Sequence, residues 1–395
     1  MKKKCNICNK KFLDYLNLGL HPCADTFLKN KNRAINLKKY PLVVGFCECS
    51  HLTSIYKVPE NERYEKYEYS YTSDNSPVSR HHFKSIAKRI IKNYKISKNS
   101  LIVEAGSNDG TFLREIKNYS KSRVLGVDPS KNISNLAKKK NLNTFVGYFN
   151  LQNSKKIFKK YGNADVIYGA NVFNHVDDNK NFLKGAHMLL KNNGVLVLEV
   201  PDLNSLLEKT GFDTIYHEHR HYYTEKSLKK ILNTERFNIL KFEKISYMAG
   251  SIRVFATKKN INFKNKISKV TLLDFKKFKK NIKFVKKEII KFVDKYKKKK
   301  IDIYGLGAAT KGNTLLNYCK LNYKNIESIL DKSDHKINKF TPGSGIKIVN
   351  ESTIKNIGAI IILPWNITKH LEKKYKNNKN SIISIQKVVK KLNER

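Results

Sequence analysis

Short apolar runs alternate with amphipathic segments between residues 100 and 258. The apolar runs predict strands at 101–105, 123–128, 165–169 and 194–200, with helices between them. This alternation is typical of βαβ units, so a mainly parallel sheet is expected. Two later runs, 237–245 and 251–257, predict an antiparallel pair that closes the sheet.

The regions on either side carry different patterns. Residues 1–60 read as strand-poor, and a helix is expected over 82–93. Downstream, apolar residues recur every three or four positions and predict one long basic helix over 262–297, with a stripe of Phe275, Phe278, Ile282, Val285, Ile289 and Phe292. From residue 300 a strand, a glycine-rich turn and a helix follow one another. Further strands are expected at 328–331, 359–364 and 381–385.

The fold class expected from these patterns is α/β, with a Rossmann-like central domain and a second, smaller α/β domain. The boundaries we expect are 1–70 for a cysteine-containing N-terminal region, 71–260 for the central domain, 261–298 for a linker helix and 299–395 for a C-terminal Rossmann-like domain.

The chain is strongly basic, with 79 Lys and Arg against 33 Asp and Glu and a net charge of +46. The excess is almost all Lys and is spread over the whole chain, as an A/T-rich coding sequence would give, whereas a nucleic-acid footprint should cluster. No apolar run reaches the roughly 18–20 residues of a membrane span, and no apolar segment follows the basic N-terminus. We therefore expect a cytoplasmic protein, monomer or homodimer, without a membrane or nucleic-acid partner.

A glycine turn follows the first strand of the central region, within the segment LIVEAGSNDGTFL. The candidate cofactor residues in it are Glu104, Gly106, Asn108, Asp109 and Gly110. The next strand ends at Asp128, 24 residues after Glu104, where a carboxylate can accept hydrogen bonds from ribose hydroxyls. The turn lacks the G-x-G-x-x-G pattern and is acidic, so a diphosphate would be repelled. S-adenosylmethionine has no phosphate and carries a cation, and it is the cofactor we expect here.

Five of the six cysteines lie in the first fifty residues. In a cytosolic chain such clustering indicates metal binding more than disulfides. Cys5 and Cys8 have the C-x-x-C spacing of a zinc knuckle, and Cys47 and Cys49 could complete a tetrahedral thiolate site for structural Zn²⁺. The second pair is one residue short, so His51 or Cys23 could replace one of its members. Free buried cysteines are the other reading.

The segment FDTIYHEHRHYYT adds a more specific signal. Its Tyr216-His217-Glu218-His219 resembles the Y-H-E-H signature of the deoxysugar C-methyltransferases, class I S-adenosylmethionine-dependent enzymes that act on nucleotide-linked keto-sugars. Further matching segments follow in family order: the early cysteine pairs, YSYTS at 69–73, NVFNHV at 171–176, MAGSIRV at 248–254, GLGAATKGN at 305–313, TPG at 341–343 and LPWN at 363–366. The resemblance covers nearly the whole chain.

The resemblance implies a class I methyltransferase domain between a zinc-binding region and a Rossmann-like domain. It also implies roles for single residues. His219 would be the catalytic base, with Tyr71, Tyr216, Glu218 and His175 around the sugar. Asn171 would join the cofactor site, and Arg253, Gly307 and Lys311 the substrate site.

The implied chemistry explains why these residue types are needed. A sugar carbon becomes nucleophilic when a neighbouring ketone lets an enolate form. The enzyme then needs a base for the proton and a donor for the enolate oxygen. Histidine titrates near neutral pH and suits the base, and we expect the adjacent Glu218 to orient the imidazole.

Several alternatives remain open at this level. His217, His219 and His221 alternate along the chain and would share one face of a strand, where they could bind a metal. The turn at Gly307 could hold the substrate's diphosphate with Lys311, hold a second dinucleotide, or be purely structural. A nucleic-acid methyltransferase is a rival function, although Asn171-Val172-Phe173-Asn174 stands where an N/D-P-P-Y motif would be expected. Two further alternative functions are methylation of a sugar hydroxyl and a non-catalytic scaffold role.

Overall fold

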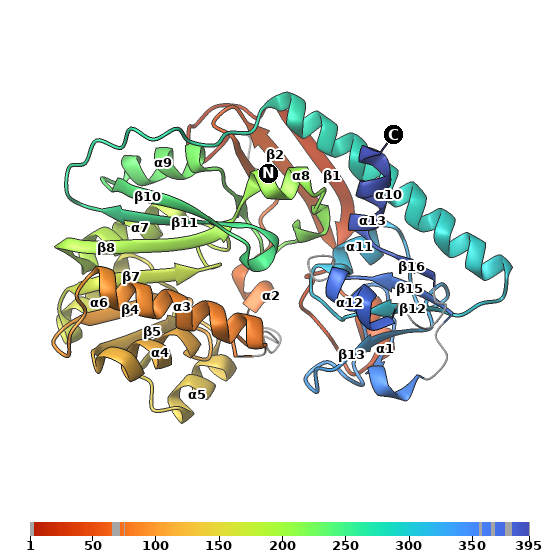
Figure 1. The fold of residues 1–395 in the computed structure, drawn as a ribbon, viewed down its shortest axis with the longest axis horizontal. Coiled ribbons are helices and arrows are strands. Elements are labelled where there is room, and N and C mark those ends of the chain that lie inside the picture. The colour runs from red at the N-terminus through yellow and green to blue at the C-terminus, as the bar shows by residue number, and fades with distance from the viewer. Residues whose placement is uncertain are drawn as a thin grey trace.

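In the computed structural model the chain forms three sheets, distributed over two lobes (Figure 1). The structure describes residues 4–64, 72–74, 76–354, 358–364, 368–375 and 381–394. The lobe on the left of Figure 1 holds a seven-stranded sheet, and the lobe on the right a five-stranded one. A four-stranded sheet built mainly from the N-terminal region lies at the top, between them.

The central sheet has the strand order β10-β11-β8-β7-β4-β5-β6. Its strands are β4 (Leu101–Ala105), β5 (Arg123–Asp128), β6 (Thr144–Val146), β7 (Ala164–Ala170), β8 (Leu190–Pro201), β10 (Asn238–Ile245) and β11 (Ser251–Thr257). Strands β4 to β8 pair in parallel, while β11 pairs antiparallel with β8 and with β10. The expected parallel sheet with a closing antiparallel pair is confirmed.

Helices cover both faces of this sheet because its strands are apolar on both sides. On one face Ile102 packs with α3 and α4, and on the other Leu101 and Val103 pack with α6, α7 and α9. The helices of this lobe are α3 (Pro77–Asn93), α4 (Thr111–Ser120), α5 (Lys131–Lys139), α6 (Leu151–Tyr161), α7 (Asn179–Leu189), α8 (Leu203–Glu208) and α9 (Glu225–Thr234). Helix α3 starts earlier than expected, where the side chain of Ser76 caps its first turn and Pro77 follows.

The N-terminal region is not strand-poor, and that expectation was wrong. Strands β1 (Asp14–His21), β2 (Tyr40–Cys47) and β3 (His51–Ser54) pair antiparallel, and β9 (His221–Tyr222) joins the edge of β3. In β1 the buried Leu16 and Leu18 alternate with outward-facing residues, which is the period of a half-buried strand. Two short helices, α1 (Lys31–Ile35) and α2 (Glu60–Tyr64), belong to the same region.

The C-terminal sheet is wholly parallel, with the order β14-β13-β12-β15-β16. Its strands are β12 (Ile303–Leu306), β13 (Ser328–Asp331), β14 (Ile348–Asn350), β15 (Ala359–Ile362) and β16 (Ser381–Ile383), and its helices are α11 (Gly312–Tyr318), α12 (Thr368–Tyr375) and α13 (Ile385–Asn393). This is the small second α/β domain that the sequence predicts. Short 3₁₀ turns lie at Phe212–Thr214 (η1), Tyr247–Ala249 (η2) and Glu351–Thr353 (η3).

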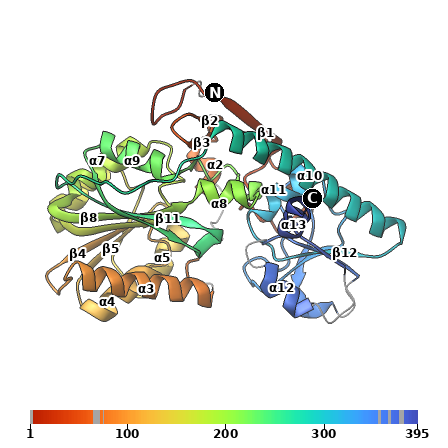
Figure 2. The same cartoon turned by 45° about the horizontal axis from the view of Figure 1, so that its top comes forward.

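The long basic helix is α10 (Leu272–Lys298), and it begins ten residues later than expected. Thr271 and Asp274 form a capping box, in which each side chain bonds the other residue's backbone N–H, and this fixes the start. Figures 1 and 2 both show α10 running from the N-terminal sheet along the C-terminal domain. Its apolar stripe shares one core with both, which makes the right-hand lobe and the N-terminal sheet a single packed unit.

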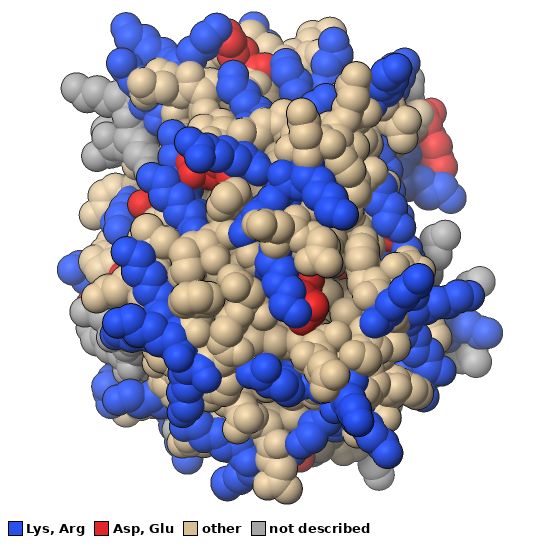
Figure 3. All heavy atoms as spheres, turned by 90° about the vertical axis from the view of Figure 1, so that its left-hand side faces the viewer, with Lys and Arg blue, Asp and Glu red and all other residues tan. Residues whose placement is uncertain are grey.

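The surface carries its basic residues without a dominant patch on the side drawn in Figure 3, where Lys and Arg are spread between neutral residues. No helix in the described part of the chain is both long and apolar enough to cross a membrane.

Candidate active site

The glycine turn after β4 lies where the strand order of the central sheet reverses. Strand β4 is flanked by β5 on one side and β7 on the other, and ligands of open α/β sheets bind at the carboxyl ends of strands at such a point. Gly106 (φ +66°) and Gly110 (φ +78°) adopt left-handed conformations. A Cβ atom at Gly106 would lie 2.8 Å from the Val172 side chain, so glycine is required on steric grounds as well.

Asp128, at the tip of β5, holds this turn in place. Its carboxylate accepts hydrogen bonds from the backbone N–H of Asn108 and of Ser130, both at 2.9 Å. Gly106 N–H bonds the carbonyl of Val127 at 2.8 Å. The acid predicted from its spacing therefore lies directly beside the turn, with its two oxygens oriented by backbone donors.

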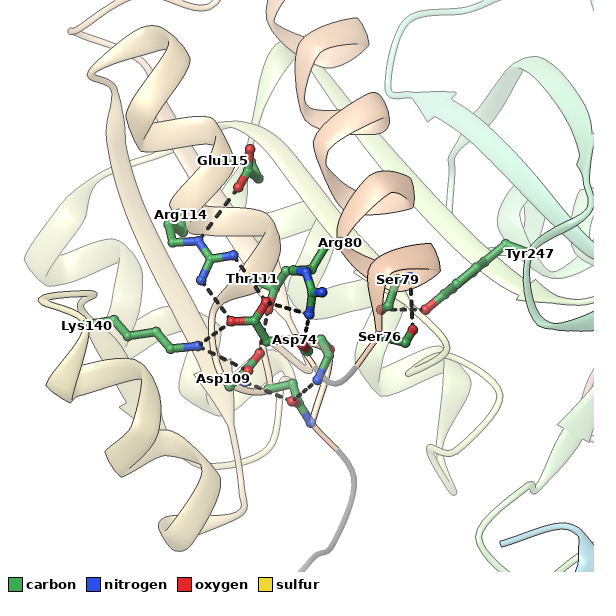
Figure 4. Close-up of polar contacts among 12 residues, drawn as sticks. Asp74, Ser76, Ser79, Arg80, Asp109, Thr111, Arg114, Glu115, Lys140 and Tyr247 are labelled. Atoms are coloured by element: carbon green, nitrogen blue, oxygen red, sulfur yellow. Dashed lines mark hydrogen bonds and ion pairs between the residues drawn. The ribbon is translucent and has the colours of Figure 1, made fainter. Parts of the chain in front are cut away.

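A chain of charges ties the turn to the segment that precedes α3 (Figure 4). Lys140 lies 3.2 Å from Asp109 and 3.3 Å from Asp74, and Arg114 bonds the same Asp74 carboxylate at 2.9 Å. Ser73 N–H also donates to the Asn108 side chain at 2.9 Å. Tyr71, one of the predicted catalytic residues, lies outside the described residues, two positions before Ser73.

The glycine turn after β4, which we call the donor turn below, is lined by buried acidic groups. Glu104 is buried, and burial together with the nearby carboxylates of Asp109, Asp128 and Glu199 raises its pKa well above the usual range. Its Oε2 atom is buried without a hydrogen-bond partner in the described structure. A buried carboxylate oxygen in this state favours a cationic ligand, because a cation offsets the cost of burial. The ammonium and sulfonium groups of S-adenosylmethionine fit that requirement.

Arg253 and Asn171 lie at the neighbouring strands. Arg253, on β11, is buried and bonds Glu199 of β8 at 2.7 Å and Glu243 at 3.2 Å. Glu199 also accepts hydrogen bonds from Tyr168 and His82. The Arg253 guanidinium is thus engaged in a buried ion-pair network. Asn171, at the end of β7, has a left-handed backbone (φ 52°) and donates its N–H to the Glu199 carbonyl.

The Y-H-E-H segment lies at the same edge of the sheet as the donor turn. The carbonyl of Asn174, just after β7, accepts the N–H groups of Arg220 (2.8 Å) and His221 (3.0 Å). Asp202, just after β8, forms an isolated parallel β-bridge with Tyr223. Both contacts anchor the segment at the carboxyl ends of β7 and β8, the neighbours of β4 on one side.

His219 has a defined tautomer. Its Nδ1 lies 2.9 Å from the Thr214 carbonyl oxygen, which can only accept, so Nδ1 carries the proton. Its Nε2 is then the acceptor for the Tyr216 hydroxyl at 2.8 Å. Burial lowers the pKa of His219 to about 3, and the Lys311 charge acts in the same direction. His175 lies edge-on to this ring at 4.8 Å between centroids, and its own pKa is lowered by burial.

Glu218 does not orient the imidazole, contrary to the expectation. The hydrogen bonds of His219 go to Thr214 and Tyr216, whereas Glu218 accepts the N–H of Asp25 at 3.1 Å. Successive residues of the turn point in different directions, so adjacency in sequence does not bring these two side chains together. Burial and the Asp25 charge raise the pKa of Glu218 to about 7.

The three alternating histidines do not form a metal site either. His217 bonds the carbonyl of His21, His219 bonds Thr214, and His221 bonds the Thr53 hydroxyl. The segment is a strand only at His221–Tyr222, so the three rings do not share a face.

The C-terminal domain reaches this site through the start of α11. Thr314 bonds the carbonyl of Ile215 at 3.1 Å, and Thr310 bonds the Asp25 carboxylate at 2.6 Å. Lys311 lies between these threonines. Burial lowers its pKa to about 8, and the Asp213 charge opposes that shift. Asp25 and Asp213 were not singled out from the sequence, because only the packing of three separate segments brings them here.

The turn at Gly307 is already hydrogen-bonded. Gly307 (φ +83°) donates its N–H to the Leu330 carbonyl, and Ala308 donates to the Asp331 carboxylate at 2.5 Å. A Cβ at Gly307 would lie 2.7 Å from Pro364. These two amides are engaged by residues of β13, which favours a structural role for the Gly307 turn over anion binding.

Four cysteines, two from the segment before β1 and two from the end of β2 and the turn after it, lie close together. The Sγ atoms of Cys5, Cys8, Cys47 and Cys49 all lie within 4.8 Å of one another. Cys5 and Cys49 are 3.8 Å apart, which matches the edge of a tetrahedron with Zn–S bonds of about 2.3 Å, whereas Cys8 and Cys47, at 3.0 Å, lie closer together than that edge. The shortened second pair therefore still joins the cluster, and Cys23 packs elsewhere, beside Tyr40 and Val58. This donor set fits Zn²⁺, and no position is left for a reacting ligand, as in structural sites.

Comparisons with known proteins agree with this geometry. A family model described as "Methyltransferase domain" matches residues 79–241, and one described as "C-methyltransferase C-terminal domain" matches residues 247–384. The chain is 26% identical over 394 residues to the C-methyltransferase NovU of Streptomyces niveus, covering 95% of this chain and 93% of that one.

Solved structures match over about half of the chain. Magnesium protoporphyrin IX methyltransferase (ChlM) from Synechocystis PCC 6803 with bound SAH is 16% identical and covers 47% of this chain and 88% of its own, with a TM-score of 0.37. The PH0226 protein from Pyrococcus horikoshii OT3 is 15% identical and covers 48% of this chain and 96% of its own, also at 0.37. On its domain order, its acidic donor turn and its matches to both family models, this chain is an S-adenosylmethionine-dependent C-methyltransferase related to NovU.

Proposed function

We propose that the protein methylates a carbon next to the ketone of a nucleotide-linked keto-deoxysugar. The base would be His219, and the product of its action an enolate whose carbon receives the methyl group. The single observation that supports this most is the tautomer of His219. Its Nδ1 is bonded to a backbone carbonyl, and its basic Nε2 faces the Tyr216 hydroxyl at the edge of the sheet that carries the donor turn.

The low pKa of His219 keeps its Nε2 unprotonated throughout the neutral range. Proton abstraction places a negative enolate beside the ring, and an opposite charge at short range favours the imidazolium. Tyr216 would release its hydrogen bond to Nε2 and donate to the substrate instead. His175 would close the site behind the ring, since the two rings are in edge contact.

Lys311 would stabilise the enolate oxygen. With a pKa of about 8 it is mostly charged at neutral pH, and its charge reaches His219. A buried cation near developing negative charge stabilises a transition state more strongly than an exposed one. Asp213 would hold the ammonium in place without the enolate present.

S-adenosylmethionine, when bound, supplies an electrophilic methyl group. The residues we propose to hold it are Glu104 for its cationic end, and Asp128 for ribose hydroxyls, because each Asp128 oxygen keeps a lone pair beyond its backbone bond. The turn glycines allow close approach of the backbone, and Asn171 borders the turn from β7. Arg253 would act indirectly, by holding Glu199 beside Glu104.

The cysteine cluster would hold one Zn²⁺ with a structural role. It lies at the turn between β2 and β3, where Cys47 and His51 form the last pair of the β2–β3 ladder. Through β3 and β9 this sheet positions the Y-H-E-H segment, so zinc would act on catalysis only by keeping that segment folded.

A panel assay tests the proposal. The purified protein is incubated with S-adenosylmethionine labelled in its methyl group and with nucleotide-linked 4-keto and 3-keto deoxysugars, their hydroxyl analogues, and RNA and DNA oligonucleotides. We expect label on carbon of a keto-sugar only, with mass and NMR locating it beside the ketone. Label on a hydroxyl oxygen or on nucleic acid would contradict the proposal.

A further inference from the structure

Asp177 lies in the loop between β7 and α7, two residues after His175, and the chemistry above does not use it. Its carboxylate lies 2.8 Å from the guanidinium of Arg63 and 2.8 Å from that of Arg220. A third cation, the exposed ammonium of Lys57, lies at 3.1 Å. Both guanidiniums are almost completely buried, so this carboxylate connects two charged side chains that solvent does not reach.

Arg220 fixes the backbone that follows His219. Its guanidinium donates to the carbonyl of Tyr56, and its own carbonyl accepts the N–H of Ser54 at 2.9 Å. The N–H of Arg220 donates to the carbonyl of Asn174 in the β7–α7 loop. The Ser54 hydroxyl also donates to the His219 carbonyl at 3.2 Å. The peptide between His219 and Arg220 is therefore held by β3 on one side and by the β7–α7 loop on the other.

Arg63, on α2, supports the loop that carries His175. One of its terminal nitrogens lies 2.8 Å from the Asp177 carboxylate, and the other donates to the His175 carbonyl at 3.3 Å. The rings of His175 and His219 are in edge contact, at 4.8 Å between centroids. One carboxylate thus joins the two arginines that support the backbone beside each of these rings.

The charges around Asp177 show what its carboxylate does. Burial would raise the pKa of Asp177, but the charges of Arg63 and Arg220 and the hydrogen bonds it accepts together outweigh burial, and the pKa is lowered. Glu60 lies beside the same carboxylate, and burial together with the hydrogen bond to Asp177 raises the Glu60 pKa. Asp177 is therefore the more acidic of the two carboxylates. Without its charge the two buried guanidiniums would lose their common anion, and moving one of them toward solvent would displace the backbone that it holds.

We propose that Asp177 is a positioning residue for proton abstraction. By joining Arg63 to Arg220, it sets how the two histidine rings meet. The assignment rests on the proposed function, because it takes His219 as the base. One use of a buried ion pair is to fix a single arrangement of the groups around it. Loss of the Asp177 charge should therefore slow the reaction step more than it weakens the binding of either substrate.

Deuterium exchange on the full-length protein tests the proposal. Wild type, Asp177→Asn, Asp177→Glu and Asp178→Asn are incubated with S-adenosylhomocysteine and a keto-sugar that carries deuterium beside its ketone, and NMR follows the loss of the label. Asp177→Asn keeps the shape of the side chain and removes its charge. We expect exchange and kcat to fall about 10- to 100-fold, as for a misplacement of about 1 Å. KM and the Kd for S-adenosylmethionine should stay within about twofold, and Asp177→Glu should recover part of the loss because the charge returns.

Asp178→Asn is the matched control. It removes the same charge from the next residue, whose side chain caps α7 by accepting the N–H of Asn181, and asparagine caps a helix equally well. Its exchange rate should equal that of wild type. Urea unfolding gives the folded fraction of each variant, so that rates are compared per folded molecule. If Asp177→Asn does not fold, Arg63→Lys takes its place. It keeps the charge without the planar fork, and exchange should again fall while donor affinity is unchanged.

Exchange at the wild-type rate by folded Asp177→Asn would overturn the proposal. A loss of donor affinity as large as the loss of exchange would also overturn it, because Asp177 would then act on the whole fold. A measurement without substrate separates this result from the proposed function. The NMR shifts of the His175 and His219 rings should change in Asp177→Asn and not in Asp178→Asn. Unchanged shifts would overturn the proposal even if wild type methylates no keto-sugar, whereas changed shifts in a protein whose wild type exchanges no keto-sugar would support the role of Asp177 and contradict the proposed chemistry.

Discussion

The Nδ1 of His219 lies 2.9 Å from the carbonyl oxygen of Thr214, and this contact decides which ring nitrogen can take a proton. Because a carbonyl only accepts, Nε2 is left as the basic atom. The ring is also held by stacking on Tyr216, at 4.0 Å between centroids.

Lys311 should be needed for turnover but not for binding of the methyl donor. Lys311→Met should lower kcat on the keto-sugar by about 10²–10³-fold, the range found when a transition-state anion loses one donor. The Kd for S-adenosylmethionine should stay within about twofold, because the donor turn is on β4. Lys324→Met, an exposed change in the same domain, is the control.

The same lysine should set the alkaline limb of the pH profile. With a pKa of about 8, Lys311 loses its charge as pH rises, so wild-type kcat/KM should fall above about pH 8. Lys311→Arg should keep part of the activity and lose that limb, since arginine stays charged. An unchanged limb in Lys311→Arg would show that another group causes it.

Asp74 should contribute to the affinity for S-adenosylmethionine, although it does not belong to the donor turn. Asp74→Asn removes the partner shared by Arg114 and Lys140 and loosens the link to Asp109 and Asn108 (Figure 4). We expect S-adenosylmethionine to bind about three- to tenfold more weakly, as for the loss of a part-exposed charge network. Higher salt should narrow the difference from wild type. Asp334→Asn, exposed in the C-terminal domain, should bind the donor like wild type, and equal binding by both variants would refute the link.

Freshly purified protein should contain about one zinc per chain by elemental analysis. Cys5→Ser/Cys8→Ser should lose the metal and melt at a lower temperature, because binding free energy is also folding free energy. Cys319→Ala removes a buried cysteine outside the cluster and should keep its zinc. A metal-free wild type that melts at the same temperature as the double variant would contradict a zinc site.

His217 should make folding sensitive to acid. Its folded pKa is lowered to about 3 by burial from an ordinary value of 6.5, so the unfolded chain binds one more proton between these values. Stability should therefore rise with pH from about 3 to 6.5. His217→Gln should reduce the slope at pH 5 by about 1.4 kcal/mol per pH unit, which is one proton. Urea unfolding at several pH values measures this, and an unchanged slope would mean that His217 is charged in the folded protein.

The sheet of the central domain was predictable because its signals are local. The apolar strands and the glycine turn between Glu104 and Gly110 each lie within a few residues, and their order implies the parallel sheet. The N-terminal region was predicted to be strand-poor although β1 alternates buried and outward-facing residues, and only the fourth strand of its sheet, His221–Tyr222, comes from far along the chain. The first residue of α10 was placed too early because the basic pattern of the helix continues upstream of it. In the folded chain the capping box at Thr271 fixes where the helix begins.

In the candidate site, too, contacts between residues close in sequence could be predicted, and contacts between distant segments could not. The resemblance named His219 and Tyr216, and their contact at 2.8 Å joins residues only three positions apart. The partners of Glu218 could not be read from the sequence, because Asp25 reaches it from a region almost two hundred residues away. Lys311 is brought in by a different domain through the packing of α11 on η1, and no local pattern encodes that contact.

The central claim is that His219 removes a proton from the carbon beside a ketone. It is tested by following deuterium at that carbon of the keto-sugar, by NMR, with S-adenosylhomocysteine in place of the methyl donor so that exchange occurs without methyl transfer. Wild type should wash deuterium into the solvent, and His219→Ala should do so about 10²–10⁴-fold more slowly, the usual contribution of a positioned general base. Donor affinity should stay near that of wild type. Exchange by His219→Ala at the wild-type rate would contradict the account and leave His175 as the next candidate base.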